Sequence, residues 1–254
     1  AGNQRHNALL NQPDSYLGPL LTAHPDWANY DQRGNPIPIG QQKPFLDPAN
    51  SDVRRYLLSL IEEIVTTYDV DGVQLDYIRY PFQDPGAGRT YGYGVAARQQ
   101  FQQLTGVDPT TISPSDRDLW QQWTDFRIEQ INSFVAETSD LLHQRDPDLI
   151  LSTAVFALSE HDRTHKIQQQ WEVWAERGDV DMIVTMSYAA DANRLQQLVE
   201  PWLTAEHLGA TLVLPSIRLL DLSESNALDQ IQALRDLPSG GFALFAAENL
   251  TGTL

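Results

Sequence analysis

The sequence contains no cysteine. Disulfide bonds, thiol nucleophiles and thiolate metal sites are therefore excluded. Positive charge is also scarce, because 17 Lys and Arg stand against 34 Asp and Glu, which gives a net charge of −17. A surface this negative repels phosphate backbones and anionic lipids, so we expect no nucleic-acid partner. A neutral or cationic small substrate fits this charge better.

Several signature motifs are missing as well. No apolar run approaches the ~20 residues of a membrane-spanning helix, and we expect no membrane insertion of this segment. There is no glycine-rich dinucleotide or phosphate-binding loop and no Gly-x-Ser-x-Gly elbow. His161 and His165 have the i, i+4 spacing of zinc ligands, but the Glu that follows the first His in such motifs is absent, and so is an evident third ligand. The sequence predicts neither a metal site nor a cofactor.

Apolar and aromatic residues, by contrast, are plentiful. The 254 residues are 41% hydrophobic and include six Trp, nine Tyr and eight Phe. Such a chain can bury a substantial core, which excludes wholesale disorder. Its length suits a single α/β barrel, which uses roughly 250 residues.

The pattern changes character at residue 51. Residues 1–50 are rich in Asn, Gln, Pro and Gly and are predicted to be ordered loop, with a helical turn near Leu17–Ala23. Apolar residues at i, i+3, i+4 spacing then predict an amphipathic helix over 51–68. Strand-like apolar runs follow at Gly72–Ile78, Leu149–Phe156, Met182–Ser187, Thr211–Ile217 and Gly241–Ala246. Helical patterns lie near 95–105, 116–145, 166–177, 191–207 and 224–236.

Strands that alternate with helices predict a parallel sheet, closed as a barrel or doubly wound. About five strands are legible, whereas a closed barrel of this kind needs eight. Either residues 1–50 hide strands or the chain starts inside the fold, and we favour the second. We therefore expect one domain over 1–254, an incomplete α/β barrel of the TIM type, with 1–50 as a loop region on its C-terminal rim and regular β/α units over 51–254.

The densest cluster of polar residues surrounds Asp76. In the run from Asp69 to Pro81, Val73 and Leu75 alternate with Gln74 and Asp76, which puts a carboxylate at the C-terminal end of an apolar strand. That end of an α/β barrel is its active-site face. Asp76 is therefore a candidate catalytic carboxylate or acceptor for sugar hydroxyls. The alternative is a structural Asp that caps a turn and pairs with Arg79.

This run and the residues before it resemble the glycosyl-hydrolase-like family ten, near-continuously over residues 23–81 and more loosely afterwards. The resemblance is carried by Ala23-His24-Pro25-Asp26-Trp27, Phe45-Leu46-Asp47-Pro48, Val53-Arg54-Arg55-Tyr56 and the run Tyr68–Pro81, and later by 181–188 and 240–245. It implies a (β/α)8 barrel that is extracytoplasmic in bacteria and cleaves cell-wall or other polysaccharide. It also implies that Gly72–Ile78 is the fourth strand, with three strands lying upstream of Ala1.

Glycoside cleavage usually needs two carboxyl groups, ~5–5.5 Å apart for retention and ~6.5–9.5 Å apart for inversion of the anomeric centre. Asp76 matches the family's strand-four aspartate and is our candidate nucleophile or base. Asp191, which follows the strand ending at Tyr188, is the candidate acid partner. Its rivals are Glu160, Asp162 and Glu248, which also follow strand ends, and each of these acids could instead be a helix cap or a solvated loop residue.

Other side chains near strand ends are candidates for binding the substrate. Aromatic residues at barrel mouths commonly stack on sugar rings, and arginines bind hydroxyl or carboxylate groups. The candidates are Trp27, Tyr77, Arg79, Tyr80, Tyr188 and Arg218. For the aromatic residues the alternative is packing in the core, and for the arginines it is an ion pair.

The sequence thus favours a glycosidase that binds an oligosaccharide or polysaccharide. A non-catalytic carbohydrate-binding barrel that lacks one of the two carboxylates is the first alternative. The second is a fragment of a larger enzyme that is inactive alone, because missing strands leave unpaired edges.

Overall fold

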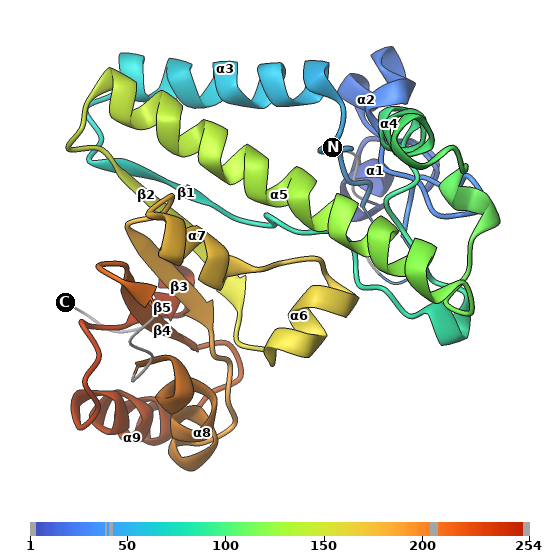
Figure 1. Ribbon diagram of the computed structural model, residues 1–254. Helices are drawn as coiled ribbons and strands as arrows, with labels where there is room; N and C mark the ends of the chain where they lie inside the picture. Colours follow the sequence, from blue (N-terminus) through green and yellow to red (C-terminus); the bar gives the residue numbers. More distant parts are fainter. Residues whose placement is uncertain (1–3, 39, 41–42, 204–207, 251–254) are drawn as a thin grey trace. The chain divides into compact units, whose positions relative to one another are not determined.

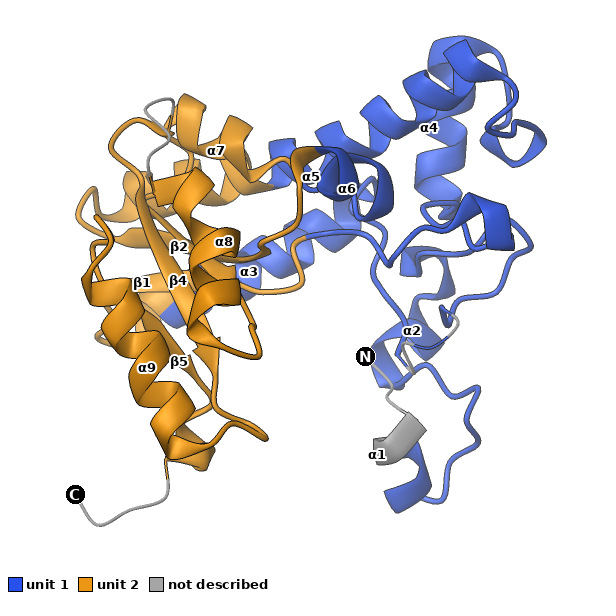
Figure 2. Ribbon diagram, turned by 90° about the horizontal axis from the view of Figure 1, so that it is seen from below, with its two compact units in different colours: residues 1–64, 79–134, 161–169 blue, residues 65–78, 135–160, 170–254 orange. Residues whose placement is uncertain are grey.

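The computed structural model describes residues 4–38, 40, 43–203 and 208–250. The chain divides into two compact units, shown in different colours in Figure 2. Unit 1 comprises residues 1–64, 79–134 and 161–169, and unit 2 comprises 65–78, 135–160 and 170–254. Each unit is described by itself.

Unit 2 contains the sheet predicted from the sequence. Its strands are β1 (Gly72–Leu75), β2 (Ile150–Phe156), β3 (Met182–Met186), β4 (Leu212–Arg218) and β5 (Ala243–Phe245). They lie in the order β1-β2-β3-β4-β5, all neighbours are parallel, and together they form a curled half-barrel (Figure 1). The predicted fold class, α/β of the TIM-barrel type with five parallel strands, is confirmed.

The two faces of this sheet differ because side chains alternate along each strand. The outer face carries the buried side chains Leu151, Val155, Ile183, Val213 and Ile217. The inner face carries the exposed or half-buried side chains Gln74, Met182, Val184, Leu214 and Arg218. Gln74 and Arg218, the polar side chains of this set, are exposed.

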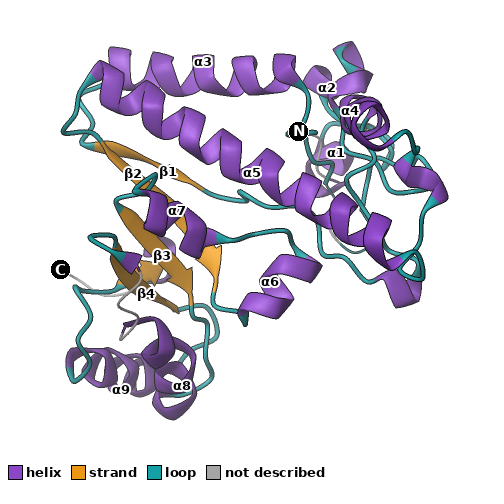
Figure 3. Ribbon diagram, viewed as in Figure 1, coloured by secondary structure: helices purple, strands orange, loops and turns teal. Residues whose placement is uncertain are grey.

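Helices cover the outer face. The helices α8 (Ala192–Leu203) and α9 (Glu224–Arg235) lie side by side (Figure 3). Their apolar side chains form one buried cluster with Ile217 of β4. This packing fixes β4, and with it the position of the residues at its C-terminal end.

One helix is predicted near 166–177, whereas the structure has one helix before this range and one within it. The first is α6 (Glu160–Lys166) and the second is α7 (Trp171–Arg177). Gln168 between them has a φ of 51°, in the left-handed region that no α-helix continues through. The periodic pattern alone does not reveal this break.

Unit 1 is built from helices and loops. Its helices are α1 (Gln4–Leu9), α2 (Pro19–Ala23), α4 (Val95–Thr105), α6 from His161 onward, and the first parts of α3 (Ser51–Thr67) and α5 (Arg117–Arg145), both of which continue into unit 2. Short 3-10 turns lie at Pro25–Trp27, Pro85–Ala87 and Pro109–Thr111. Up to Asn50 the described part of the chain contains no parallel strand, and its β-pairing consists of isolated antiparallel bridges. The helix α1 was not predicted.

Candidate functional site

The C-terminal ends of the strands in unit 2 bring several predicted residues to one edge of the sheet. Asp76 directly follows β1, Tyr188 follows β3, and Arg218 ends β4. Phe245 ends β5 and pairs in register with Arg218. We call Asp76, Tyr77, Tyr188, Arg218 and Phe245 the strand-end cluster. It lies at the edge where α/β barrels carry their active sites.

Asp76 is exposed and only lightly engaged by the protein. Its Oδ1 accepts a hydrogen bond from the backbone N–H of Tyr77 at 2.7 Å. Within the described part of the chain it makes no other hydrogen bond and no ion pair. The alternative in which Asp76 pairs with Arg79 is thus not observed, and the carboxylate can still accept hydrogen bonds from a ligand.

The backbone turns sharply just after this carboxylate. Tyr77 has a φ of 55°, a left-handed conformation that costs a non-glycine residue roughly 1–2 kcal/mol. The turn ends β1 three residues before the predicted end at Ile78 and leaves the Tyr77 ring 47% exposed. Strained residues of this kind concentrate at functional sites.

The pKa of Tyr188 is affected by the charges of the strand-end cluster. Partial burial raises the pKa of its phenol, a hydrogen bond with Ser216 lowers it, and the Asp76 carboxylate raises it while Arg218 lowers it. Asp76, Arg218 and Tyr188 therefore share one electrostatic environment, although they come from three different strands. The sequence predicted each of them separately, and the structure brings them together.

Hydrogen bonds inside the sheet hold the polar side chains near this edge. The Ser152 hydroxyl donates to Oε1 of Gln74 at 3.0 Å, on the inner face. Ser216 donates to the backbone oxygen of Thr185 at 2.9 Å, and the hydroxyls of Thr185 and Ser187 are 2.7 Å apart. These contacts link β1 to β2 and β3 to β4 through polar side chains.

Asp191, the predicted acid partner, caps a helix. Its Oδ1 accepts the backbone N–H of Arg194 at 2.8 Å at the start of α8, and its side chain is exposed. Among the rivals, Asp162 pairs with Lys166 at 2.8 Å, Glu160 begins α6, and Glu248 is exposed in a 3-10 turn after β5. The second carboxyl group of the site remains a prediction.

Three predicted substrate-binding residues belong to unit 1 and are buried there. Trp27 stacks on His24 with ring centroids 4.2 Å apart, inside an apolar cluster. Tyr80 is fully buried, and the guanidinium of Arg79 donates to the backbone oxygen of Tyr80 and lies over the Phe45 ring. These side chains serve the packing of unit 1 in the structure.

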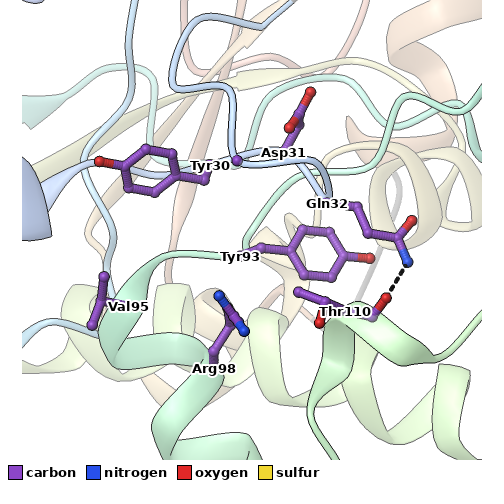
Figure 4. A pocket seen from close by; sticks show the side chains of 8 residues that line it. Tyr30, Asp31, Gln32, Tyr93, Val95, Arg98 and Thr110 are labelled. Carbon is purple, nitrogen blue, oxygen red and sulfur yellow. Dashed lines mark hydrogen bonds between the residues drawn. The ribbon is translucent and has the colours of Figure 1, made fainter.

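Unit 1 also contains a cavity of about 210 Å³, shown in Figure 4. Most polar groups in its wall are already bound by the protein. The Asp31 carboxylate accepts three hydrogen bonds from Arg33 and Asn35, and Arg98 forms an ion pair with Asp108. Gln32 donates to the backbone oxygen of Thr110. The strand-end cluster is therefore the stronger candidate site.

The described residues contain neither a cluster of metal-ligating side chains nor a membrane-spanning helix. Within residues 4–38, 40, 43–203 and 208–250, no group of three or more His, Cys, Asp or Glu side chains is arranged to hold a metal ion. Over the same residues, none of the helices combines the length and the apolar character of a transmembrane span.

The sequence as a whole matches the family described as glycosyl hydrolase-like 10, over residues 10–229. The chain belongs to this family. Its sequence resemblance at residues 23–81 is thereby confirmed, and Asp76 lies inside the matched range. Membership in the glycosyl hydrolase-like 10 family supports a glycan-related, hydrolase-like fold.

One curated protein and one solved structure are similar to this chain. An S-layer-related protein of Niallia circulans is 32% identical over 141 residues, which cover 48% of this chain and 8% of that protein. The structure of bee venom hyaluronidase in complex with a hyaluronic acid tetramer has a TM-score of 0.51 and 13% sequence identity, covering 82% of this chain and 73% of that one. At this identity the hyaluronidase shows the fold alone. The glycosyl hydrolase-like 10 chain thus spans a small part of its curated relative.

Sequence reasoning missed Phe245 and Gln74 as members of the site region. Both were visible in principle, since Gln74 alternates with Asp76 on β1 and Phe245 ends the last strand. Asp76 is a candidate because it lies at a strand end on the inner face, and the same criterion applies to Phe245.

Proposed function

We propose that the protein is a glycoside hydrolase that acts on a polysaccharide, with Asp76 as its central carboxylate. The observation that carries the proposal is the placement of Asp76: exposed, at the C-terminal end of a parallel strand, beside Tyr188 and Arg218, and bound by the protein through one backbone N–H.

In the proposed reaction Asp76 acts as nucleophile or as base. A nucleophilic Asp76 attacks the anomeric carbon and forms a glycosyl ester that water then hydrolyses, whereas a basic Asp76 takes a proton from the attacking water. Either route needs a second carboxyl group that protonates the leaving oxygen. Asp191 is our candidate, because it lies three residues past Tyr188. To act as acid, it has to release its cap on α8.

The second candidate function is carbohydrate binding without hydrolysis. The observation that favours it is the same hydrogen bond between Asp191 and the N–H of Arg194, because capping explains the presence of Asp191 without any catalysis. In that case the strand-end cluster binds a glycan and no bond is cleaved.

For the substrate we propose a cell-wall or other extracellular polysaccharide, and for the site of action the space outside the cytoplasm. The support is the family resemblance at residues 23–81, together with the S-layer-related relative, whose name refers to the outer layer of a cell envelope. No nucleic acid is proposed as a partner, because the net charge is −17.

The test is digestion of a panel of polysaccharides and muropeptides by the wild-type protein and its Asp76→Asn variant. The variant keeps the shape and removes the charge, so we expect activity to fall by orders of magnitude. Stability should stay within about 1–2 kcal/mol, because Asp76 is exposed. Asp71→Asn, at the opposite end of the same strand, is the matched control and should keep full activity.

The outcomes separate the two candidate functions. If Asp76→Asn cleaves at the wild-type rate, the chemistry lies elsewhere. If the wild type cleaves nothing but binds glycans in affinity electrophoresis, the carbohydrate-binding function stands instead.

A further inference from the structure

Two aromatic rings of the strand-end cluster lie nearly parallel. The ring centroids of Tyr188 and Phe245 are 6.0 Å apart and their planes differ by 18°. Both rings remain open to solvent, with Tyr188 38% and Phe245 55% exposed. Large aromatic side chains are usually buried, so two adjacent parallel rings at a barrel edge form an unusual apolar surface.

The backbone holds this surface in place. The N–H of Leu219 donates to the backbone oxygen of Phe245 at 2.7 Å, and Phe245 pairs in register with Arg218 on β4. Tyr188 is tied to the same strand through Ser216. Because hydrogen bonds of the sheet hold the Phe245 backbone, a ligand that stacks on the two rings loses less of its binding free energy to ordering the chain there.

The chemistry of such a surface suits a sugar ring. One face of a pyranose presents C–H bonds, whose hydrogens carry partial positive charge and meet the negative face of an aromatic ring. Stacking also removes apolar area of both partners from water. The hydroxyl groups at the rim of the sugar remain free to bind polar side chains, and Asp76 and Arg218 are the charged groups that act on Tyr188 here.

We propose that Tyr188 and Phe245 together form an aromatic platform that binds one pyranose ring of the glycan. Phe245 is the new member of the site. The proposal rests on the proposed function in one respect, since it takes a glycan to be the ligand. It does not require that the bound glycan is cleaved.

The test measures binding of soluble tetrasaccharides by isothermal titration calorimetry, with the N-acetylglucosamine tetramer, the hyaluronic acid tetramer and cellotetraose as probes. Phe245→Ala should raise the Kd of the best probe roughly tenfold or more, because an aromatic contact of this kind contributes on the order of one factor of ten. Phe245→Trp should retain or improve binding. Phe245→Leu keeps an apolar side chain without a ring and should bind weakly.

Phe242→Ala is the matched control. Phe242 precedes the same strand, is 38% exposed, and lies outside the cluster. Its removal should leave the Kd unchanged. Melting temperatures of all variants show whether a loss of binding reflects misfolding, and Phe245→Leu serves as the second variant if Phe245→Ala does not fold.

The outcomes distinguish this inference from the proposed hydrolase. If the wild type binds a probe and Phe245→Ala and Phe245→Leu both bind it within twofold of the wild type, the platform is refuted and the hydrolase is untouched. If Phe245→Ala loses binding to a probe that the wild type binds but never cleaves, the platform stands and the hydrolase fails. A wild type that binds no probe overturns both.

Discussion

In unit 1, Asp47 and Arg127 are buried and their polar atoms are bound by the protein itself, whereas in unit 2, Asp76 and Arg218 are exposed at strand ends. The contrast extends to the hydrogen bonds. The Arg127 guanidinium donates to the backbone oxygens of Trp123 and Tyr91 and to the side chains of Gln83 and Thr124. Arg218 makes no side-chain hydrogen bond or ion pair within the part of the chain that the structure describes.

This difference indicates what each group does. A buried charge is tolerated when the surrounding protein satisfies its hydrogen bonds, and such a group then holds distant segments together. An exposed charge with open hydrogen-bonding capacity contributes little to folding and can bind a ligand. We therefore assign Asp47 and Arg127 to the fold, and we propose Asp76 and Arg218 as residues of the site.

Of the changes considered, replacement of Arg127 and of Arg218 by alanine should give the largest difference in the free energy of unfolding. Arg127→Ala removes four hydrogen bonds and a guanidinium that lies 5.1 Å from the Trp123 ring centroid. It also leaves a cavity and buried acceptors without donors, so we expect the free energy of unfolding to fall by about 3–5 kcal/mol. Arg218→Ala should change it by less than about 0.5 kcal/mol. Urea titration measures both, and equal losses would remove the distinction between the units.

The stability of the protein should depend on pH through Asp47. Burial raises the pKa of Asp47 to about 7, although the backbone N–H groups of Ala49 and Ala97 lower it. The folded state therefore binds the Asp47 proton more tightly than the unfolded state, in which the pKa is near 3.8. The contribution of Asp47 to stability is complete below about pH 4 and is lost as the pH rises to about 7.

Asp47→Asn mimics the protonated form and has no such dependence. The difference in unfolding free energy between wild type and Asp47→Asn should shift by about 2–4 kcal/mol between pH 4 and pH 7. The wild type should be the protein that loses stability as the pH rises. Urea titrations at four pH values decide this, and parallel curves for wild type and Asp47→Asn would contradict the burial of a titrating carboxyl group.

Much of the fold of unit 2 could be predicted from the sequence because its signals are local. Apolar periodicity placed a helix at 51–68 where the structure has Ser51–Thr67, and all five apolar runs are strands. Parallel strands share one C-terminal edge, so the same reasoning placed Asp76 and Arg218 at that edge. The strand β1 ends at Leu75 and not at the predicted Ile78, because Tyr77 takes a left-handed conformation. The composition of the sequence does not encode that conformation.

The polar core of unit 1 could not be predicted in this way. Asp47 belongs to the Phe45-Leu46-Asp47-Pro48 run that resembles the family, but its partner Ala97 lies 50 residues further along the chain. No periodic pattern links such residues. For the same reason the burial of Trp27 and Tyr80 could not be predicted. The sequence makes both residues candidates for binding sugar, whereas the structure buries both.

The smallest predicted effect concerns the tightness of the packing around Asp47. Gly94 precedes α4 with φ −61° and ψ 160°, angles that alanine adopts without strain. A Cβ at this position would nevertheless overlap the Asp47 carboxylate, whose Oδ2 accepts the N–H of Ala97 at 3.2 Å. Gly94→Ala therefore pushes a buried acceptor away from its donor, and we expect a loss of about 1–3 kcal/mol.

Gly86→Ala is the matched control for this packing. A Cβ on Gly86 would have its nearest neighbour, Oδ1 of Asp84, at 3.6 Å, which is an ordinary van der Waals contact. We expect its free energy of unfolding to stay within about 0.5 kcal/mol of the wild type. If Gly94→Ala is equally neutral in urea titration, Asp47 can move without loss. The contrast between the two units would then rest on burial alone.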